Sequence, residues 1–458
     1  MILRMAKSLT MMKTCSSRCL LKHFGSLPCK LKPRQFPSRS AIGPWMLSSR
    51  HLSGNEPAKN ERSGGFRMSL DVDYIQQHVL ELRKYNRKGD GNLQEVETLL
   101  RRFNSASNSE KERLALELSN AALLLPNKMN PAVPIGDESQ ANVVGYIGEK
   151  RDFDFEPKDH VAIGEDVGIM RVRNLGHFTG HRSYYLIGEG AELEQALIRY
   201  TLDRLLKKGF RCISVPDIVN SFVFEGCGMQ TSGVRTQVYH LDPRRHVDLC
   251  LAGTSEVSVA GYYMNQTLQA KDLPQRLTAI SRCYRAETAH TAEAKGIYRV
   301  HQFTKVEMFA VASDEEQSDQ LHHDFLAIEK ELFSELGLHF RILDMPSEEL
   351  GAPAYRKYDI EAWMPGRSTY GEISSTSNCT DYQSRRLNIK YLDDSSRTHF
   401  IHTVNGTACA VPRMIIAILE TYQQEDGSVA IPDALQAYMK GRKVICKTGR
   451  KPMHFCRF

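Results

Sequence analysis

Charged residues recur on one strand parity between residues 282 and 309, in the segment "RCYRAETAHTAEAKGIYRVHQFTKVEMF". Residues two apart on a strand share a face, so Arg285 and Glu287 are expected to point the same way on a first strand. On a second strand one parity is charged or aromatic: Arg299, Phe303, Lys305 and Glu307. The other parity is apolar: Val300, Val306 and Met308. The apolar parity predicts a core face, whereas the charged parity predicts either a ligand cleft or a solvated face with cross-strand ion pairs.

Composition is that of a globular protein with room for two or three domains, because the chain has 458 residues, 41% of them hydrophobic and 25% charged. No apolar run reaches the length of a membrane-spanning helix, so no membrane contact is expected. The net charge of +6 is concentrated at the start, since residues 1–55 hold ten Lys and Arg and no acid. The remaining residues carry 50 basic against 54 acidic side chains, so any nucleic-acid contact must depend on local basic patches.

Residues 1–55 are rich in Arg, Lys and Ser and lack the continuous apolar stretch of a secretory signal. This composition predicts a mitochondrial transit peptide, with a disordered basic tail as the alternative. Residues 56–68 have the composition of a linker. Three of the eleven cysteines lie in the leader, and the others show no CxxC pairing, which favours a reduced compartment such as the mitochondrial matrix.

Residues 69–127 are predicted to form amphipathic helices, in "LDVDYIQQHVLELRKYN", "NLQEVETLLRRF" and "SEKERLALELSNAALLL". Residues 128–438 have a different pattern, in which short apolar strands predominate. A long helix, "ELEQALIRYTLDRLLKKG", leads into a β-rich run that carries Pro216, and short apolar strands then follow, among them "HVDLCLAGTSEVSVAGYY". Runs of strands with few long helices predict an α+β domain built on an antiparallel sheet. Residues 439–458 form a basic C-terminal tail.

Three segments carry a family resemblance. The hairpin at 282–309 resembles motif 2 of the class II aminoacyl-tRNA synthetases, and the long helix with its Pro216 strand is similar to motif 1. The segment "NGTACAVPRMIIAILE" resembles motif 3, whose Arg413 would open a buried helix. "VHQFTKVEMF", "GTSEV" and "YGEISSTSNCTDYQSRR" are similar to the seryl branch, and "CGM", "AWMPGR" and "AVPR" to its animal mitochondrial members. The resemblance covers roughly residues 125–438.

The resemblance implies a class II catalytic domain, an antiparallel sheet flanked by helices, preceded by a short coiled-coil arm that binds tRNA. Motif 1 implies a homodimer. The implied reaction joins serine to ATP as seryl-adenylate and then transfers the seryl group to the 3′ end of mitochondrial tRNA(Ser) in the matrix. Because the attacking carboxylate is already ionised, no general base is required, and catalysis rests on alignment and charge stabilisation.

The resemblance also assigns an ATP site. Arg285 would fork onto the α-phosphate and the serine carboxylate, a planar contact that lysine does not make. Glu287 would contact the adenine amino group, Phe303 would stack on the ring, and Arg413 would hold the γ-phosphate. Glu372 and Ser375 would ligate Mg²⁺, which prefers oxygen ligands. By this reading Arg285, Glu372 and Arg413 carry the catalysis.

The serine site implied by the resemblance consists of Thr254, Glu256, Arg285, Glu307, Asn405 and Thr407. A pocket built to bond a hydroxyl rejects alanine because its buried polar groups would be left unpaired. Lys305 and Arg299 are open candidates at this point, whereas His181 and Arg182 are expected to support the fold or the dimer.

Two features depart from the family pattern. Pro412 replaces the glycine that family members commonly carry before the motif 3 arginine, although proline suits a first helical turn. The arm is short, and tRNA binding would then depend more on the remaining helices and the basic tail. The chain could therefore be a synthetase-like paralogue or isoform with a binding or regulatory role and impaired tRNA charging. A class II ligase for another amino acid is the third possibility. The loop "TAHTAEAKGI" is expected to be mobile.

Overall fold

A computed structural model describes residues 66–85, 87, 91–233, 236–287 and 295–447. The predicted transit peptide, most of the predicted linker, the end of the basic tail and residues 288–294 of the hairpin loop lie outside the described residues. Among the described helices, none is both long and apolar enough to cross a membrane.

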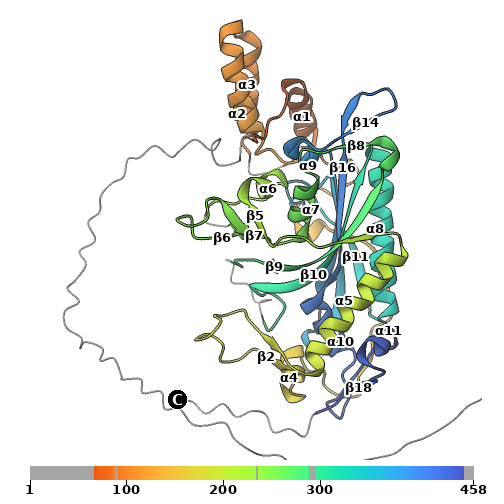
Figure 1. The fold of residues 1–458 in the computed structure, drawn as a ribbon. Helices are drawn as coiled ribbons and strands as arrows, with labels where there is room; N and C mark the ends of the chain where they lie inside the picture. Colours follow the sequence, from red (N-terminus) through yellow and green to blue (C-terminus); the bar gives the residue numbers. More distant parts are fainter. Residues whose placement is uncertain (1–65, 86, 88–90, 234–235, 288–294, 448–458) are drawn as a thin grey trace, which may run out of the picture. The chain divides into compact units, whose positions relative to one another are not determined.

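The N-terminal module contains the three predicted helices: α1 (Val72–Tyr85), α2 (Leu93–Ser105) and α3 (Asn108–Ala122). Asn92 caps α2 by accepting a hydrogen bond from the backbone N–H of Glu95. Apolar side chains at helical spacing, such as Val96 and Leu99 of α2 and Leu118 of α3, are buried against one another. With 13 residues in α2 and 15 in α3, each helix is only about 20 Å long. Figure 1 shows α2 and α3 side by side.

The buried side chain of Arg87 ties this module to the rest of the chain. Its Nη1 donates hydrogen bonds to the carbonyls of Asn127, Lys128 and Ala354, at 2.6, 3.0 and 2.9 Å, and Nη2 donates to Gly351 at 2.9 Å. A buried guanidinium needs such partners to offset its desolvation. The helical module is therefore held against the segments that precede the central sheet and its strand β12.

The central sheet has eight strands in the order β1-β11-β12-β13-β16-β10-β9-β4. Their bounds are β1 (Asn142–Ile147), β11 (Phe340–Asp344), β12 (Arg356–Met364), β13 (Thr369–Thr380), β16 (His402–Ala410), β10 (Gln302–Ala312), β9 (Gln275–Tyr284) and β4 (Arg211–Ile213). Every pairing is antiparallel except that of β4 with β9. The α+β prediction is confirmed.

Smaller sheets surround the central one. They contain β2 (Met170–Arg171) with β3 (Tyr185–Leu186); β5 (Ile218–Asn220), β7 (Leu249–Leu251) and β6 (Tyr239–His240); β15 (Thr398–Phe400), β14 (Lys390–Leu392) and β8 (Thr267–Gln269); and β17 (Val429–Ala430) with β18 (Val444–Ile445). The short 3₁₀ helices are η2 (Glu138–Gln140), η3 (Ala270–Asp272), η5 (Pro365–Arg367) and η6 (Ala437–Met439). Strand β18 lies within the predicted basic tail, whose boundary stays a prediction.

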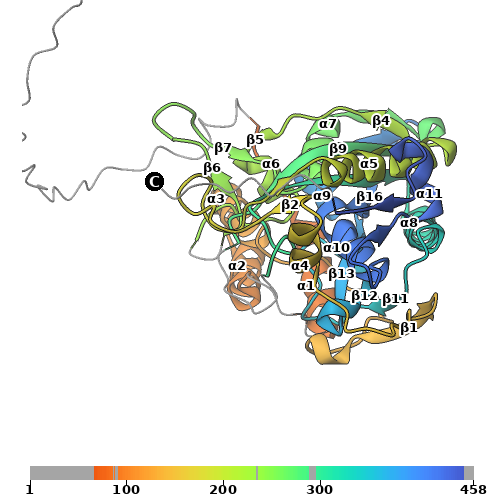
Figure 2. The same cartoon turned by 90° about the horizontal axis from the view of Figure 1, so that it is seen from below.

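One face of the sheet is covered by helices α5 (Glu189–Lys207), α8 (Glu315–Glu335) and α10 (Val411–Thr421), with α4 (His160–Asp166) and α11 (Asp433–Gln436) beside them (Figures 1 and 2). Val306 and Met308 of β10 point into this core, as their parity predicted. The opposite face packs against α6 (Ser221–Gly226), α7 (Ser255–Tyr263) and α9 (Tyr382–Leu387). Phe309 of β10 faces this second core, so Lys305 and Glu307 share its side of the sheet.

One local expectation was wrong, and one helix was missed. The segment after β7 was expected to be strand, but residues 255–263 form α7, because Thr254 caps it and its apolar residues are buried on several sides. Helix α8 was not predicted, although Asp314 caps it and Leu321, Phe325, Ile328 and Leu332 recur at helical spacing.

Candidate active site

A pocket is lined by residues of β10, β13 and β16, of the hairpin that joins β9 to β10, and of the first turn of α10. Its lining combines four cations with two acids: Arg285, Arg299, Lys305 and Arg413, with Glu287 and Glu372. Phe303, Ser375 and Thr407 also line it. The excess of cations over acids, within a partly buried setting, favours a polyanionic ligand. Seven of the predicted site residues therefore meet in one pocket: Arg285, Glu287, Phe303, Glu372, Ser375, Thr407 and Arg413.

Arg285 and Glu287 were predicted to lie on the first strand, but β9 ends at Tyr284. The backbone N–H of Arg285 still donates to His301 across the hairpin at 3.0 Å, and its Nε donates to the carbonyl of Gly253 at 3.2 Å. The guanidinium carbon lies 5.3 Å from the centre of the Phe303 ring. This arrangement leaves the outer edge of the guanidinium facing the pocket.

Glu287 adopts a left-handed backbone conformation, with φ of 46°, so it does not continue the strand. Its backbone N–H donates to Gln237 Oε1 at 2.7 Å. Its carboxylate lies 3.9 Å from Arg182 and 4.0 Å from Arg299. Arg182, which was expected to support the fold or the dimer, thus contacts a residue predicted to bind adenine.

Arg413 stands in the first turn of α10, directly after Pro412, as the motif predicted. Its Nη1 lies 2.9 Å from Glu372 Oε2 and donates to the Glu372 carbonyl at 3.0 Å. The guanidinium carbon also lies 4.5 Å from the centre of the Tyr298 ring. Burial alone would raise the pKa of Glu372, but Arg413 and Lys357 lower it to about 2. Glu372 is therefore a carboxylate at neutral pH.

Glu372 and Ser375 are three residues apart on β13, a spacing that puts side chains on opposite faces of a regular strand. A register shift changes this: Glu361 pairs with Glu372 and Ile360 with Ser374, which leaves Ile373 as an extra residue. Both Glu372 and Ser375 consequently line the pocket. A carboxylate and a hydroxyl on one wall are suitable ligands for Mg²⁺. Within the described residues, no group of three or more His, Cys, Asp and Glu could hold a metal ion by itself, so phosphate or water oxygens would complete its coordination.

A second, smaller site lies behind this pocket and is centred on Glu307, which is 6% exposed. Its Oε1 accepts hydrogen bonds from Thr254 Oγ1, at 2.5 Å, and from Lys305 Nζ. Its Oε2 accepts from the backbone N–H of Ser255, at 2.6 Å, and from the Ser255 hydroxyl. Burial would raise the pKa of Glu307, but Lys305 and the hydrogen bonds from Ser255 and Thr254 lower it. The N-terminus of α7 further favours the ionised form.

Glu256, on α7, is the second carboxylate of this inner site. Its Oε1 accepts from Gln383 at 2.6 Å and from Asn405 at 2.9 Å. Burial and the nearby charge of Glu307 raise the pKa of Glu256 to about 7. The two neighbouring carboxylates therefore differ in pKa: that of Glu307 is lowered, and that of Glu256 is raised to about 7.

Strand β16 also carries a bulge at this site. Val306 pairs with Cys409 and Glu307 with Thr407, so Ala408 is an extra residue. Thr407 lines the pocket, whereas Asn405 faces Glu256. The inner site thus gathers the remaining predicted residues, namely Thr254, Glu256, Glu307 and Asn405; the first three are buried and Asn405 is partly buried.

Sequence reasoning missed two contributors, Tyr298 and Gln383, and left Lys305 open. Lys305 shares strand parity with Glu307, which was the available signal. Tyr298 directly precedes the charged Arg299 of the returning strand, but nothing local shows that its ring meets Arg413. Gln383 lies on α9, far along the chain, and only tertiary packing brings it to Glu256.

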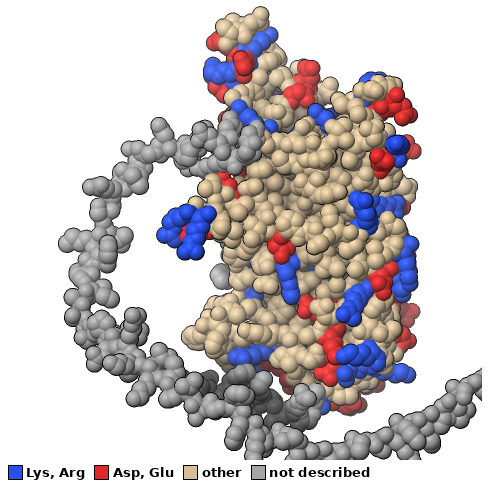
Figure 3. Space-filling view, in the orientation of Figure 1, with Lys and Arg blue, Asp and Glu red and all other residues tan. Residues whose placement is uncertain are grey.

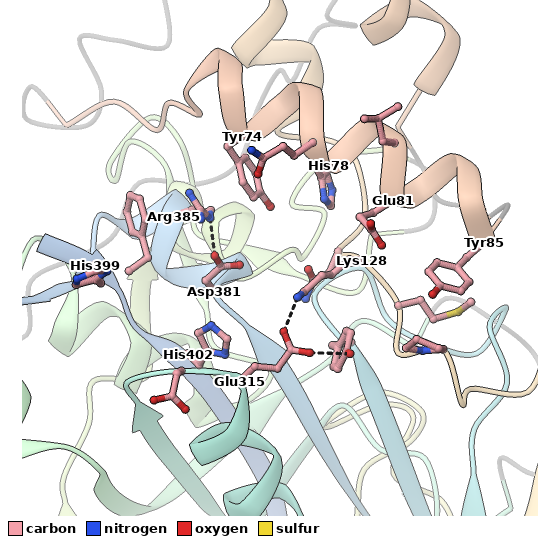
Figure 4. Close-up of a pocket in the computed structure, with 18 of the residues that line it drawn as sticks. Tyr74, His78, Glu81, Tyr85, Lys128, Glu315, Asp381, Arg385, His399 and His402 are labelled. Carbon is pink, nitrogen blue, oxygen red and sulfur yellow. Dashed lines mark hydrogen bonds and ion pairs between the residues drawn. The ribbon is translucent and has the colours of Figure 1, made fainter.

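A larger cavity of about 900 Å³ lies between α1 and the catalytic domain, and Figure 4 shows its lining. Two ion pairs join residues of its lining: Lys128 lies 2.6 Å from Glu315, and Arg385 lies 2.7 Å from Asp381. Tyr355 also donates to Glu315. None of the predicted site residues lines this cavity, so the smaller pocket is the candidate active site.

Comparison with known proteins agrees with this geometry. Residues 239–422 match the family described as the tRNA synthetase class II core domain (G, H, P, S and T). The chain is 44% identical over 353 residues to a serine–tRNA ligase of Rubrobacter xylanophilus, covering 77% of this chain and 81% of that protein. The chain belongs to the serine–tRNA ligase family.

Within that family, the chain is 53% identical over 340 residues to the mitochondrial serine–tRNA ligase of Mus musculus, covering 74% of this chain. The match spans 66% of the mouse protein's length. A crystal structure of seryl-tRNA synthetase from Pyrococcus horikoshii complexed with ATP has a TM-score of 0.71 and 34% identity, covering 82% of this chain and 90% of that one. The serine–tRNA ligase fold is thus shared along most of the described chain.

Proposed function

We propose that this chain is a mitochondrial serine–tRNA ligase that activates serine with ATP and transfers it to tRNA(Ser) in the matrix. The observation that carries the proposal is the pairing of two sites: a cation-lined pocket suited to a nucleotide, and a mostly buried polar site beside it suited to a small amino acid. The serine–tRNA ligase relatives and the ATP-bound structural neighbour support the assignment.

The nucleotide would occupy the outer pocket. Phe303 offers its ring to the adenine and Glu287 a carboxylate to the exocyclic amino group, while Arg413 faces the phosphate tail. Mg²⁺, held by Glu372 and Ser375, would offset phosphate charge. The ion pair between Arg413 and Glu372 fixes both side chains before any ligand arrives, which reduces the ordering required in the transition state.

Serine would occupy the inner site. Glu307 is the ionised carboxylate suited to the ammonium group, with Thr254 beside it. Glu256, Asn405 and Thr407 offer polar groups for the hydroxyl. Arg285 lies between the two sites and can bridge the serine carboxylate and the α-phosphate, so that the carboxylate oxygen attacks phosphorus as pyrophosphate leaves.

The tRNA and dimer assignments extend this proposal. Helices α2 and α3 form a short hairpin suited to a tRNA contact, and α5 leading into β4 corresponds to motif 1, on which the homodimer proposal rests. Figure 3 shows basic and acidic side chains interspersed over one face, with a basic group over the β6–β7 hairpin. The exposed Arg244 and Arg245 lie between those two strands.

Serine-dependent exchange of pyrophosphate into ATP tests the activation step, and charging of tRNA(Ser) tests transfer. Exchange should require serine and should not occur with alanine. An absence of serine-dependent exchange would refute the proposal. Exchange without charging would retain serine activation but contradict the tRNA part. Size measurement in solution tests the homodimer, and fractionation of organelles tests the location.

A further inference from the structure

Lys305 occupies the position that the proposed function assigns to the substrate's ammonium group. Its Nζ donates to Glu307 Oε1 and, at 3.1 Å, to Thr254 Oγ1. These are two of the groups assigned to serine. Lys305 is 5% exposed, and it lines the outer pocket, whereas Glu307 and Thr254 do not. The lysine side chain therefore separates the nucleotide pocket from the inner site.

All hydrogen-bond acceptor positions of the Glu307 carboxylate are occupied. A carboxylate offers about four lone-pair positions, and Oε1 already accepts from Thr254 and Lys305 while Oε2 accepts from the Ser255 N–H and hydroxyl. Three of these donors are fixed at the start of α7. Only Lys305 donates from a long, flexible stem. A second ammonium group at Glu307 must take the place of the first, since two buried cations sharing one carboxylate position repel each other.

We propose that Lys305 is an internal substitute for the substrate's ammonium group, which neutralises Glu307 in the empty site and leaves it when serine binds. This inference rests on the proposed function. The departing Nζ re-enters the outer pocket, where the serine carboxylate and the α-phosphate lie. Serine binding is then an exchange of one cation for another at Glu307, and it delivers a positive charge to the reacting anions only when serine is present.

The exchange meets two requirements at Glu307: a cation in the empty site and access for the substrate's ammonium group. A buried charge without a partner costs several kcal/mol, so the empty site needs a cation at Glu307. A permanently bound cation would exclude the substrate. A lysine meets both needs because its charge is compact and its long side chain can reorient, whereas the other donors are a backbone N–H and two short hydroxyl side chains at the start of α7.

The test compares serine with ethanolamine, which has the ammonium and hydroxyl groups but no carboxylate. In the wild type, ethanolamine must displace Lys305 without offering it a new anionic partner, so it should bind far more weakly than serine. In Lys305→Met no cation has to be displaced. The dissociation constant of ethanolamine divided by that of serine should therefore fall by about tenfold. The rate of serine-dependent pyrophosphate exchange should fall at the same time, because the cation is lost from the outer pocket. Unchanged selectivity in a folded Lys305→Met variant would overturn the proposal.

Lys128→Met is the matched control, because Lys128 also pairs with a glutamate, Glu315, at 2.6 Å, but in the larger cavity. It should leave the serine-to-ethanolamine ratio unchanged, and an equal fall in this variant would also overturn the proposal. Lys305→Met leaves Glu307 without its cation and can fail to fold. A structure of the wild-type protein with serine and a non-hydrolysable ATP analogue keeps the proposal testable: Nζ should lie beyond the roughly 4 Å limit of an ion pair with Glu307.

The outcomes separate this inference from the proposed function. If the wild-type protein does not activate serine, the proposed function fails. If it activates serine but Lys305 still contacts Glu307 in the serine complex, only the exchange is refuted.

Discussion

Gly406 is the position where one added methyl group should most clearly connect packing to serine binding. It lies on β16 between Asn405 and Thr407, both assigned to the serine site. A Cβ at this position would lie 2.8 Å from Glu329 Oε1, 3.1 Å from Thr376 Oγ1 and 3.2 Å from the terminal carbon of Met308. Glu329 belongs to α8 and is fully buried, so its carboxyl cannot swing out to solvent.

Overpacking of this kind costs about 1–3 kcal/mol. The strand can relieve part of it only by lifting away from α8, which moves Asn405 relative to its 2.9 Å hydrogen bond with Glu256. A shift of about 1 Å in a binding group can reduce activity by roughly a hundredfold. We therefore expect Gly406→Ala to lower the free energy of unfolding by about 2 kcal/mol and to raise the KM for serine more than the KM for ATP.

Urea unfolding and pyrophosphate exchange at varied serine concentration measure the two effects. Gly145→Ala, on β1 of the same sheet, is the matched control, because a Cβ there meets nothing within 4 Å. It should change stability by less than about 0.5 kcal/mol. Adding Glu329→Asp to Gly406→Ala withdraws the carboxyl by one methylene and should restore part of the serine affinity. If Gly406→Ala and Gly145→Ala behave alike in both assays, the reasoning is refuted.

Two further predictions concern the site, and a third concerns the β6–β7 hairpin. Arg413→Lys should lower kcat/KM for ATP by roughly 30-fold, a loss of about 2 kcal/mol, without changing the KM for serine, because lysine cannot make both contacts with Glu372; an unchanged kcat/KM would contradict this. The pKa of Glu256 is about 7 in the folded protein, against an ordinary value of 4.5 that applies to the unfolded chain. As pH rises, the unfolded chain therefore loses this proton before the folded protein does. Urea unfolding of the wild type should therefore lose stability relative to Glu256→Gln between pH 4.5 and pH 7, and parallel profiles would refute this. Replacing both Arg244 and Arg245 with alanine should weaken tRNA charging, less so at high salt, and leave pyrophosphate exchange unchanged; loss of exchange would point instead to a folding defect.

The strand parity of residues 300–308 was readable from the sequence because side chains alternate along a strand whatever it pairs with. Val306 and Met308 accordingly face the core and Lys305 and Glu307 the site. The three N-terminal helices were readable from their apolar spacing. Helix α8 was overlooked despite its periodic pattern, and α7 was mistaken for strand because a helix buried on several sides has no clear apolar stripe.

The sequence by itself determined the family, the residue types of the site and the order in which the motifs occur. The tertiary structure decided how those residues face one another. The extra residues Ile373 and Ala408 re-aim Glu372 and Thr407, and a bulge exists only in relation to the partner strand. The contact of Lys305 with Glu307 and Thr254 likewise depends on where α7 begins against β10. The contact with Thr254 joins residues 51 apart in the chain, so no local pattern encodes it. Contacts of this kind set which groups are charged, buried and available to a substrate.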